Sequence, residues 1–197
     1  MVIPVCFLSR MKNKVFIITG PPGSGKTTFL NNLVKELRNL KIQAGGFLAE
    51  GFWVDDTRSH FELVDLFSNE RILFCKKEPH IDWNKLGHFY INPSAISFGE
   101  KVLNTANISQ FPICIIDEVG PFELQGKGWF DAIRRIMEDL PEKPMIWIVR
   151  ENLIQTVIHY FGIDNYRVIP ATSDQLERTV SELVNFLDTA VPPNIMD

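Results

Sequence analysis

Apolar residues along the chain follow two patterns. Short uninterrupted apolar runs, typical of strands that are buried on both faces, occur at residues 15–18, 113–116, 144–149 and 167–169. Stretches in which apolar residues recur every three or four positions, as in helices with one buried face, occur at residues 26–40, 129–140, 152–161 and 175–187. The first helical stripe consists of Leu30, Leu33, Val34, Leu37 and Leu40. The alternation predicts an α/β fold with a mainly parallel sheet that helices cover on both faces.

The segment between the first and second of these strands has a different pattern. Three short β-rich runs at residues 46–54, 61–66 and 72–75 are separated by polar turns, which predicts antiparallel hairpins. No linker rich in proline, glycine or serine sets the hairpins apart, so we expect an elaboration of one sheet edge and a single domain over residues 1–197. Asn92 followed by Pro93 is a typical helix start, and a helix is expected from there to about Ala106.

A glycine-rich loop lies between the first strand and the first helix. Its sequence matches the pattern G-x-x-x-x-G-K-[ST] and reads Gly20-Pro21-Pro22-Gly23-Ser24-Gly25-Lys26-Thr27. The glycines let backbone N–H groups turn toward an anion, and the N-terminus of the helix adds its positive dipole end. We expect Lys26 to neutralise charge on the β- and γ-phosphates and the Thr27 hydroxyl to bind Mg²⁺. The loop therefore predicts binding of a nucleoside triphosphate with Mg²⁺ as cofactor.

A second polar motif follows the apolar run at residues 113–116. Asp117 stands where a carboxylate is needed to hold Mg²⁺, with a cap of the next turn as the alternative. The adjacent Glu118 is the candidate general base that would polarise an attacking water. Arg150 ends the next apolar strand, and we expect either an internal arginine finger on the phosphates or a structural ion pair. Glu123 would either order the metal site or lie at the next turn.

The motif Asp117-x-x-Gly120 also occurs in signalling GTPases. Those proteins read guanine with Asn-Lys-x-Asp after a later strand. Here the Asn-Lys pair at Asn84-Lys85 lacks the aspartate and precedes Asp117, so it is rejected as a guanine code. Little selectivity among bases is expected.

Composition narrows the possible partners and location. The 197 residues are 45% hydrophobic and carry a net charge of −4, so no global basic field favours nucleic acid as the main partner. No apolar run approaches the roughly 20 residues that span a bilayer. Three cysteines without a C-x-x-C pair suit a reducing cytoplasm, where we place the protein. Residues 1–8 form either an added strand or an extension ahead of a start at Met11.

With both motifs in place, the chain resembles a small P-loop nucleoside-triphosphatase family of thermophilic prokaryotes that also includes the human cancer-related nucleoside-triphosphatase. The resemblance rests on three segments: residues 20–28, which extend the phosphate loop to Thr28; residues 44–50, with Gly45-Gly46-Phe47; and residues 116–124, with Asp117-Glu118-Val119-Gly120. It implies a RecA-like sheet and Mg²⁺-dependent hydrolysis of nucleoside triphosphates to diphosphates. The family's Gly-x-Arg-x-Gly-Phe turn is altered here at Arg58-Ser59-His60-Phe61. The resemblance is therefore weaker evidence for the substrate preference and for any arginine that this segment contributes.

Two other functions remain open on the residues. Small nucleotide kinases share this style of loop, but they usually carry an arginine-rich lid, and the chain has no tight arginine cluster. A nucleotide-gated adaptor that acts through a protein partner is the other alternative. The aromatic residues of the hairpins are expected in the hairpin core, with stacking on a nucleobase as the alternative; they are Phe47, Phe52, Trp53 and Phe61.

Overall fold

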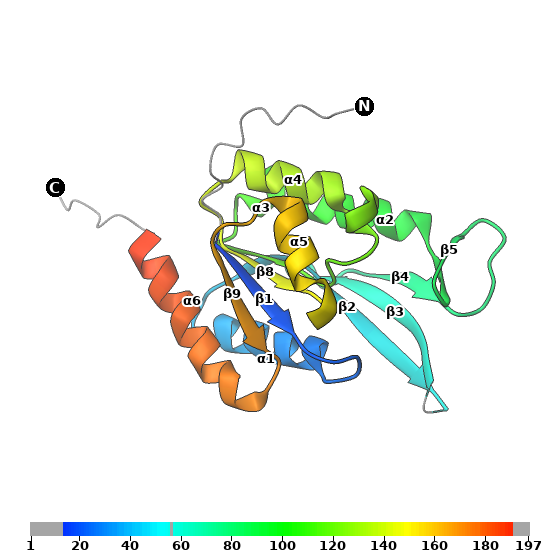
Figure 1. The fold of residues 1–197 in the computed structure, drawn as a ribbon, viewed down its shortest axis with the longest axis horizontal. Coiled ribbons are helices and arrows are strands. Elements are labelled where there is room, and N and C mark those ends of the chain that lie inside the picture. The colour runs from blue at the N-terminus through cyan, green and yellow to red at the C-terminus, as the bar shows by residue number, and fades with distance from the viewer. Residues whose placement is uncertain (1–13, 56, 191–197) are drawn as a thin grey trace.

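The structure is a computed structural model that describes residues 14–55 and 57–190. Its nine strands form one sheet in the order β5-β6-β4-β3-β2-β7-β8-β1-β9 (Figure 1). The strands are β1 Val15–Thr19, β2 Ala44–Val54, β3 Thr57–Asp65, β4 Arg71–Lys76, β5 Asn84–Leu86, β6 Phe89–Ile91, β7 Ile113–Ile116, β8 Met145–Ile148 and β9 Tyr166–Pro170. The strand considered for residues 1–8 lies outside the described residues.

The sheet has a parallel part and an antiparallel part that share β2. Strands β2, β7, β8, β1 and β9 pair in parallel, and β3, β4, β6 and β5 continue the sheet in antiparallel pairs. The first residues of β2 pair with β7, whereas its residues from Phe47 onward pair with β3. The predicted hairpin elaboration is therefore confirmed, and β2 joins it rigidly to the parallel sheet.

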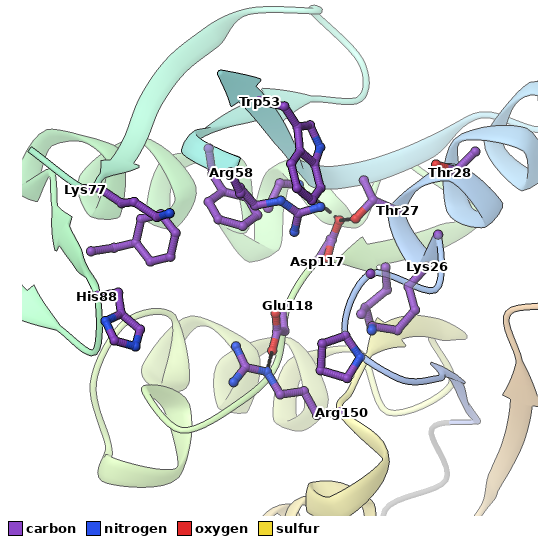
Figure 2. A pocket seen from close by; sticks show the side chains of 17 residues that line it. Lys26, Thr27, Thr28, Trp53, Arg58, Lys77, His88, Asp117, Glu118 and Arg150 are labelled. Carbon is purple, nitrogen blue, oxygen red and sulfur yellow. Dashed lines mark hydrogen bonds and ion pairs between the residues drawn. The ribbon is translucent and has the colours of Figure 1, made fainter. Parts of the chain in front are cut away.

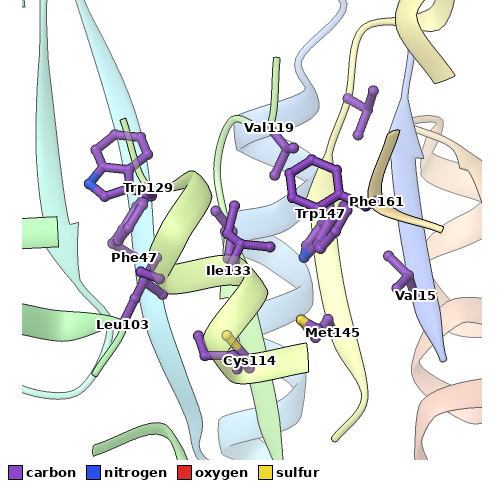
Figure 3. Packing of buried hydrophobic residues seen from close by; sticks show 14 of the residues in the cluster. Val15, Phe47, Leu103, Cys114, Val119, Trp129, Ile133, Met145, Trp147 and Phe161 are labelled. Atoms are coloured by element: carbon purple, nitrogen blue, oxygen red, sulfur yellow. The ribbon is translucent and has the colours of Figure 1, made fainter. Parts of the chain in front are cut away.

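Helices cover both faces of the parallel strands, as predicted (Figure 1). The helices are α1 Lys26–Asn39, α2 Pro93–Val102, α3 Thr105–Ile108, α4 Phe130–Asp139, α5 Ile154–Phe161 and α6 Leu176–Ala190. Helices α1 and α6 pack on one face with the even-numbered residues of β1, Phe16 and Ile18. Helices α2, α4 and α5 pack on the other face with Val15 and Ile17. Figure 3 shows this second core, where Phe47 contacts Trp129 with ring centroids 4.6 Å apart.

The predicted element boundaries need four corrections. The helix expected from Pro93 to Ala106 is two helices, because the Asn104 side chain accepts a hydrogen bond from the N–H of Ala106 and starts α3. Leu40 does not belong to the buried stripe of α1, since the helix ends at Asn39 and Leu40 is exposed. Strand β3 starts at Thr57, four residues before the predicted run. The β5–β6 hairpin, which turns at Gly87, was not predicted.

Two close contacts between strands position the strand ends. At Gly46, whose φ is +105°, an added Cβ would lie 1.9 Å from the carbonyl oxygen of Ile115, so β2 approaches β7 more closely than a side chain allows. The Thr19 hydroxyl donates to the carbonyl of Val149 at 2.9 Å, which ties the end of β1 to the end of β8. In residues 14–55 and 57–190, no helix is both long and apolar enough to cross a membrane.

Candidate functional site

The glycine-rich loop connects β1 to α1, as the sequence predicted, and ends at a left-handed residue. Gly25, with φ 83° and ψ 22°, is the N-cap of α1, a conformation that a residue with a Cβ rarely adopts. No side chain caps this end of the helix. The N–H groups of the first turn have no partner within the helix, so they are available to an anion.

Lys26 and Thr27 begin this helix and point to different partners. The Lys26 ammonium donates to the carbonyl oxygens of Gly20 and Pro21, at 3.0 and 2.8 Å, and thus lies within the curve of the loop. The Thr27 hydroxyl donates to Oδ2 of Asp117 at 3.2 Å, across 90 positions of sequence. The structure therefore brings the two predicted metal ligands into direct contact.

Asp117 is buried at the carboxyl end of β7, with 3% of its surface exposed. Besides the Thr27 hydroxyl, its Oδ2 accepts the N–H of Ala49 on β2 at 3.2 Å. The pKa of Asp117 is raised to about 7. Burial is the main cause and the negative charge of Glu118 acts in the same direction, whereas the Ala49, Thr27 and Lys26 contacts act in the opposite direction. A cation beside this carboxyl would favour its ionised form.

The oxygen atoms of Thr27 and Asp117 fit a magnesium ion. A hydroxyl and a carboxylate are hard oxygen donors of the kind Mg²⁺ prefers, and Mg²⁺ is commonly held by one or two carboxylates together with substrate phosphates and water. Among residues 14–55 and 57–190, no group of three or more His, Cys, Asp or Glu side chains is arranged to hold a metal ion. The pair therefore fits a metal ion that substrate phosphates also coordinate better than a metal ion that protein side chains alone coordinate.

Glu118 is joined to Arg150, which follows β8. The Arg150 Nε donates to Oε1 of Glu118 at 2.6 Å, and both side chains are partly exposed. The peptide bond between Asp117 and Glu118 is cis. Arg150 was expected either on the phosphates or in an ion pair, and here its charge is paired with Glu118.

The turn after Glu118 is held by buried groups. The N–H of Val119 donates to the carbonyl of Ile148 at 2.9 Å, and the N–H of Gly120 donates to Oε2 of Glu123 at 3.0 Å. Glu123 is 2% exposed, and its Oε1 makes no hydrogen bond within the described residues. Burial raises the pKa of Glu123 to about 7. Glu123 thus supports the turn that carries Glu118.

These residues line one cavity of about 1050 Å³ between the loop and the hairpins (Figure 2). The lining residues are Pro22, Gly23, Gly25, Lys26, Thr27, Thr28, Ala49, Trp53, Arg58, Phe61, Lys77, His88, Phe89, Asp117, Glu118, Ile148 and Arg150. Lys26, Thr27, Thr28, Asp117, Glu118 and Arg150 are residues that the sequence had singled out. Of the predicted loop residues, Gly20, Pro21 and Ser24 do not line the cavity.

The far wall of the cavity was not predicted. Arg58 and Trp53 come from β3 and β2, and His88 comes from the turn between β5 and β6. The sequence did not single out His88 as a site residue, and it marked Arg58 only through an altered turn. The aromatic residues differ in outcome: Phe47 belongs to the buried core, whereas Trp53, 58% exposed, and Phe61 line the cavity.

Comparison with known proteins agrees with this arrangement. A family model described as NTPase matches residues 15–181. The chain is 31% identical to the "Nucleoside-triphosphatase THEP1" of Thermotoga petrophila, over 86% of this chain and 92% of that protein. It is also 31% identical to the protein of the same name from Saccharolobus solfataricus, over 72% of this chain and 79% of that protein.

One solved structure shows the same fold. It is the solution structure of a human cancer-related nucleoside triphosphatase, which superimposes with a TM-score of 0.66 at 22% identity and covers 91% of this chain and 100% of that one. The likeness includes the α/β sheet on which the loop and the two carboxylates lie.

Proposed function

The chain belongs to the NTPase family and is a nucleoside-triphosphatase, and we propose that its hydrolysis depends on Mg²⁺, uses Glu118 as the general base and discriminates little among bases. The observation that carries the proposal is the contact between Thr27 and Asp117 beside Glu118 in the cavity that the phosphate loop lines. The proposed metal site, the proposed phosphate site and the Glu118 carboxylate then border the same cavity of about 1050 Å³.

The phosphate loop binds and orients the triphosphate. The N–H groups of residues 23–28 surround the phosphates, and Lys26 exchanges its bonds to the Gly20 and Pro21 carbonyls for bonds to phosphate oxygens. Thr27 and Asp117 would hold Mg²⁺. When bound, the ion neutralises phosphate charge and helps to orient the triphosphate.

Glu118 acts on the attacking water. Its carboxylate accepts a proton as the water oxygen bonds to the terminal phosphorus, and the bond to the bridging oxygen breaks to release the diphosphate. Arg150 acts through Glu118, because its Nε holds Oε1 and so fixes the direction of the carboxylate. We therefore propose Arg150 as a positioning residue.

Selectivity among bases is proposed to be low because the cavity offers no amide reader. Its lining contains neither asparagine nor glutamine, the side chains that most often pair with adenine edges. Apart from Arg58, Lys77 and His88, the side chains that remain for packing are aromatic or aliphatic, and they contact any base alike. Affinity then comes mainly from the phosphates and the metal.

The experiment is a product assay with the wild type and Glu118→Gln. We expect release of inorganic phosphate from ATP in water without an added acceptor, and loss of release when EDTA removes Mg²⁺. Glu118→Gln is expected to bind the nucleotide normally and to lose on the order of 10²–10⁴ in turnover, the usual contribution of a positioned base. Transfer that requires an acceptor would contradict the proposal and favour the kinase alternative. Full turnover in EDTA would contradict the Mg²⁺ assignment.

A further inference from the structure

Arg58 faces the nucleotide cavity from the side opposite the phosphate loop. It lies on β3 directly across from Trp53 on β2, after the register shift between Phe52 and Trp53. Its guanidinium carbon is 4.8 Å from the ring centroid of Trp53 and 4.9 Å from that of Phe61. Figure 2 shows the guanidinium pointing into the cavity beneath Trp53. Contact with two rings stabilises the cation without neutralising it.

Among the residues that the structure describes, no carboxylate or carbonyl oxygen accepts a hydrogen bond from the Arg58 guanidinium. Its Nε is buried and makes no hydrogen bond, and no ion pair of Arg58 occurs within residues 14–55 and 57–190. The other arginines in this part of the chain each donate to a carboxylate or carbonyl oxygen; they are Arg38, Arg71, Arg134, Arg135, Arg150, Arg167 and Arg178. A buried cationic donor without a partner is unfavourable, and an anionic ligand removes that cost.

The strand beside Arg58 makes room for this side chain. Gly51 pairs with Phe61 across the β2–β3 hairpin, and a Cβ at Gly51 would lie 2.8 Å from the Arg58 Nε. The guanidinium therefore lies against the backbone of Gly51 and contacts two aromatic rings. Such a side chain has little rotamer freedom left to lose on binding, which favours a defined contact.

Under the proposed function, the phosphates of the nucleotide are the acceptors that the cavity brings to Arg58. The other guanidinium in the lining, that of Arg150, already donates to Glu118. Under the proposed function, the terminal phosphate lies between Lys26 and Glu118, and its oxygens become the acceptors for the Arg58 donors. We propose that Arg58 is a catalytic residue: its guanidinium contacts the terminal phosphoryl group and stabilises the charge on its oxygens while the bond to the diphosphate breaks. Trp53, Phe61 and Gly51 position it.

The test compares Arg58→Ala with Arg71→Ala. Arg71 lies on the next strand, β4, and pairs with Glu50 and Glu62, so it controls for loss of an arginine in this hairpin. For Arg58→Ala we expect kcat to fall by about 10³-fold or more, as for other arginines that contact a transferring phosphoryl group. Binding of ADP, which lacks the terminal phosphate, is expected to stay within about threefold, or about 0.7 kcal/mol. Arg71→Ala is expected to leave kcat within about threefold of the wild type.

Two further measurements separate contact from structural support. Guanidinium chloride at low, non-denaturing concentration is expected to restore part of the turnover of Arg58→Ala and none of that of Glu118→Gln. Gly51→Ala, which displaces the guanidinium, is expected to lower kcat with ADP binding unchanged. Wild-type kcat in Arg58→Ala, or a loss that guanidinium does not restore together with weaker ADP binding, would overturn the inference.

The inference rests on the proposed function, and the Glu118→Gln variant distinguishes their failures. If Arg58→Ala keeps wild-type kcat while Glu118→Gln has lost it, the assignment of Arg58 fails and the proposed function stands. If both variants keep wild-type kcat, the proposed roles of Arg58 and of Glu118 both fail.

Discussion

The Nε of Arg150 and the Oε1 of Glu118 are 2.6 Å apart and join the carboxyl ends of the neighbouring strands β8 and β7. The two residues are 32 positions apart in the sequence, so the contact depends on the pairing of these strands. It leaves Oε2 of Glu118 without a hydrogen bond among the described residues, and this is the oxygen available to a water. The pair therefore orients the Glu118 carboxylate and leaves one of its two oxygens available to a water.

A double-mutant cycle tests whether Arg150 acts through Glu118. Arg150→Gln alone is expected to lower kcat by about tenfold, because Glu118 loses the group that orients it. In the Glu118→Gln background, Arg150→Gln is expected to change kcat by less than about twofold, since the effects of residues that act as a unit do not add. An additional loss as large as that in the wild-type background would mean that Arg150 contacts the phosphates itself.

Lys26→Ala is expected to abolish turnover and leave the fold intact. Its ammonium is the full positive charge that the phosphate loop itself brings to the β- and γ-phosphates. Lys35→Ala on the exposed side of the same helix is the matched control and should keep wild-type kcat. The measurements are phosphate release and circular dichroism. Turnover close to wild type in a folded Lys26→Ala sample would remove this loop from the mechanism.

Asp117→Asn is expected to weaken the binding of the Mg²⁺–nucleotide complex by about tenfold or more, or at least about 1.4 kcal/mol. The asparagine oxygen still accepts the N–H of Ala49, so the change removes the charge and keeps the shape. Titration of a fluorescent nucleotide with Mg²⁺ and with EDTA measures the effect, and the Mg²⁺-dependent gain in affinity should disappear. If Asp117→Asn binds normally and loses turnover, the roles of Asp117 and Glu118 have been exchanged.

We expect kcat/KM for ATP, GTP, CTP and UTP to agree within about tenfold. One bidentate contact to a base contributes about 1–3 kcal/mol, or roughly 5- to 150-fold, and the cavity has no amide side chain to make it. The wall formed by Trp53 and Phe61 is the feature most able to favour purines, through stacking. Phosphate release measured with each triphosphate decides the matter. A preference above about a hundredfold for one base would contradict broad specificity.

Glu123→Gln is expected to change how stability depends on pH. Burial raises the pKa of Glu123 to about 7 in the folded protein, compared with 4.5 for an ordinary glutamate. Between these pH values the unfolded chain loses the proton and the folded chain keeps it, so the free energy of unfolding of the wild type falls as pH rises. Relative to the wild type, Glu123→Gln should gain on the order of 3 kcal/mol between about pH 4.5 and 7. Urea unfolding of both proteins across this range measures it, and a pH-independent difference would argue against the shift.

Local signals in the sequence were enough for the parallel sheet and the loop. The apolar runs at 15–18, 113–116 and 145–148 are buried strands. A strand that is buried on both faces is apolar at successive positions, so it can be found from its own residues alone. The phosphate loop is a contiguous motif, so its place between β1 and α1 follows from order along the chain. Both carboxylates were located the same way, from their position at the end of a strand.

The contacts that make a site out of these motifs required the tertiary structure. Arg150 reaches Glu118 across 32 positions because β7 and β8 are neighbours in the sheet. Thr27, on the helix that follows β1, reaches Asp117 across 90 positions. The sequence does not show whether Arg150 contacts a phosphate or a carboxylate, because this depends on how residues of different strands are placed in space. The break between α2 and α3 was missed for a similar reason, since Asn104 fits a helix interior and a cap alike until its side chain is placed.

The sequence by itself therefore determined the strand–loop–helix of the proposed phosphate site and the strands of the parallel core, since these depend on patterns within a few consecutive residues. Only the tertiary structure decided which hairpin residues line the cavity. Arg58 meets Trp53 and Phe61 because β2 crosses from the parallel sheet into the hairpin and a register shift places Trp53 opposite Arg58. Strand register depends on pairing energies summed over distant residues, and no local pattern carries that information.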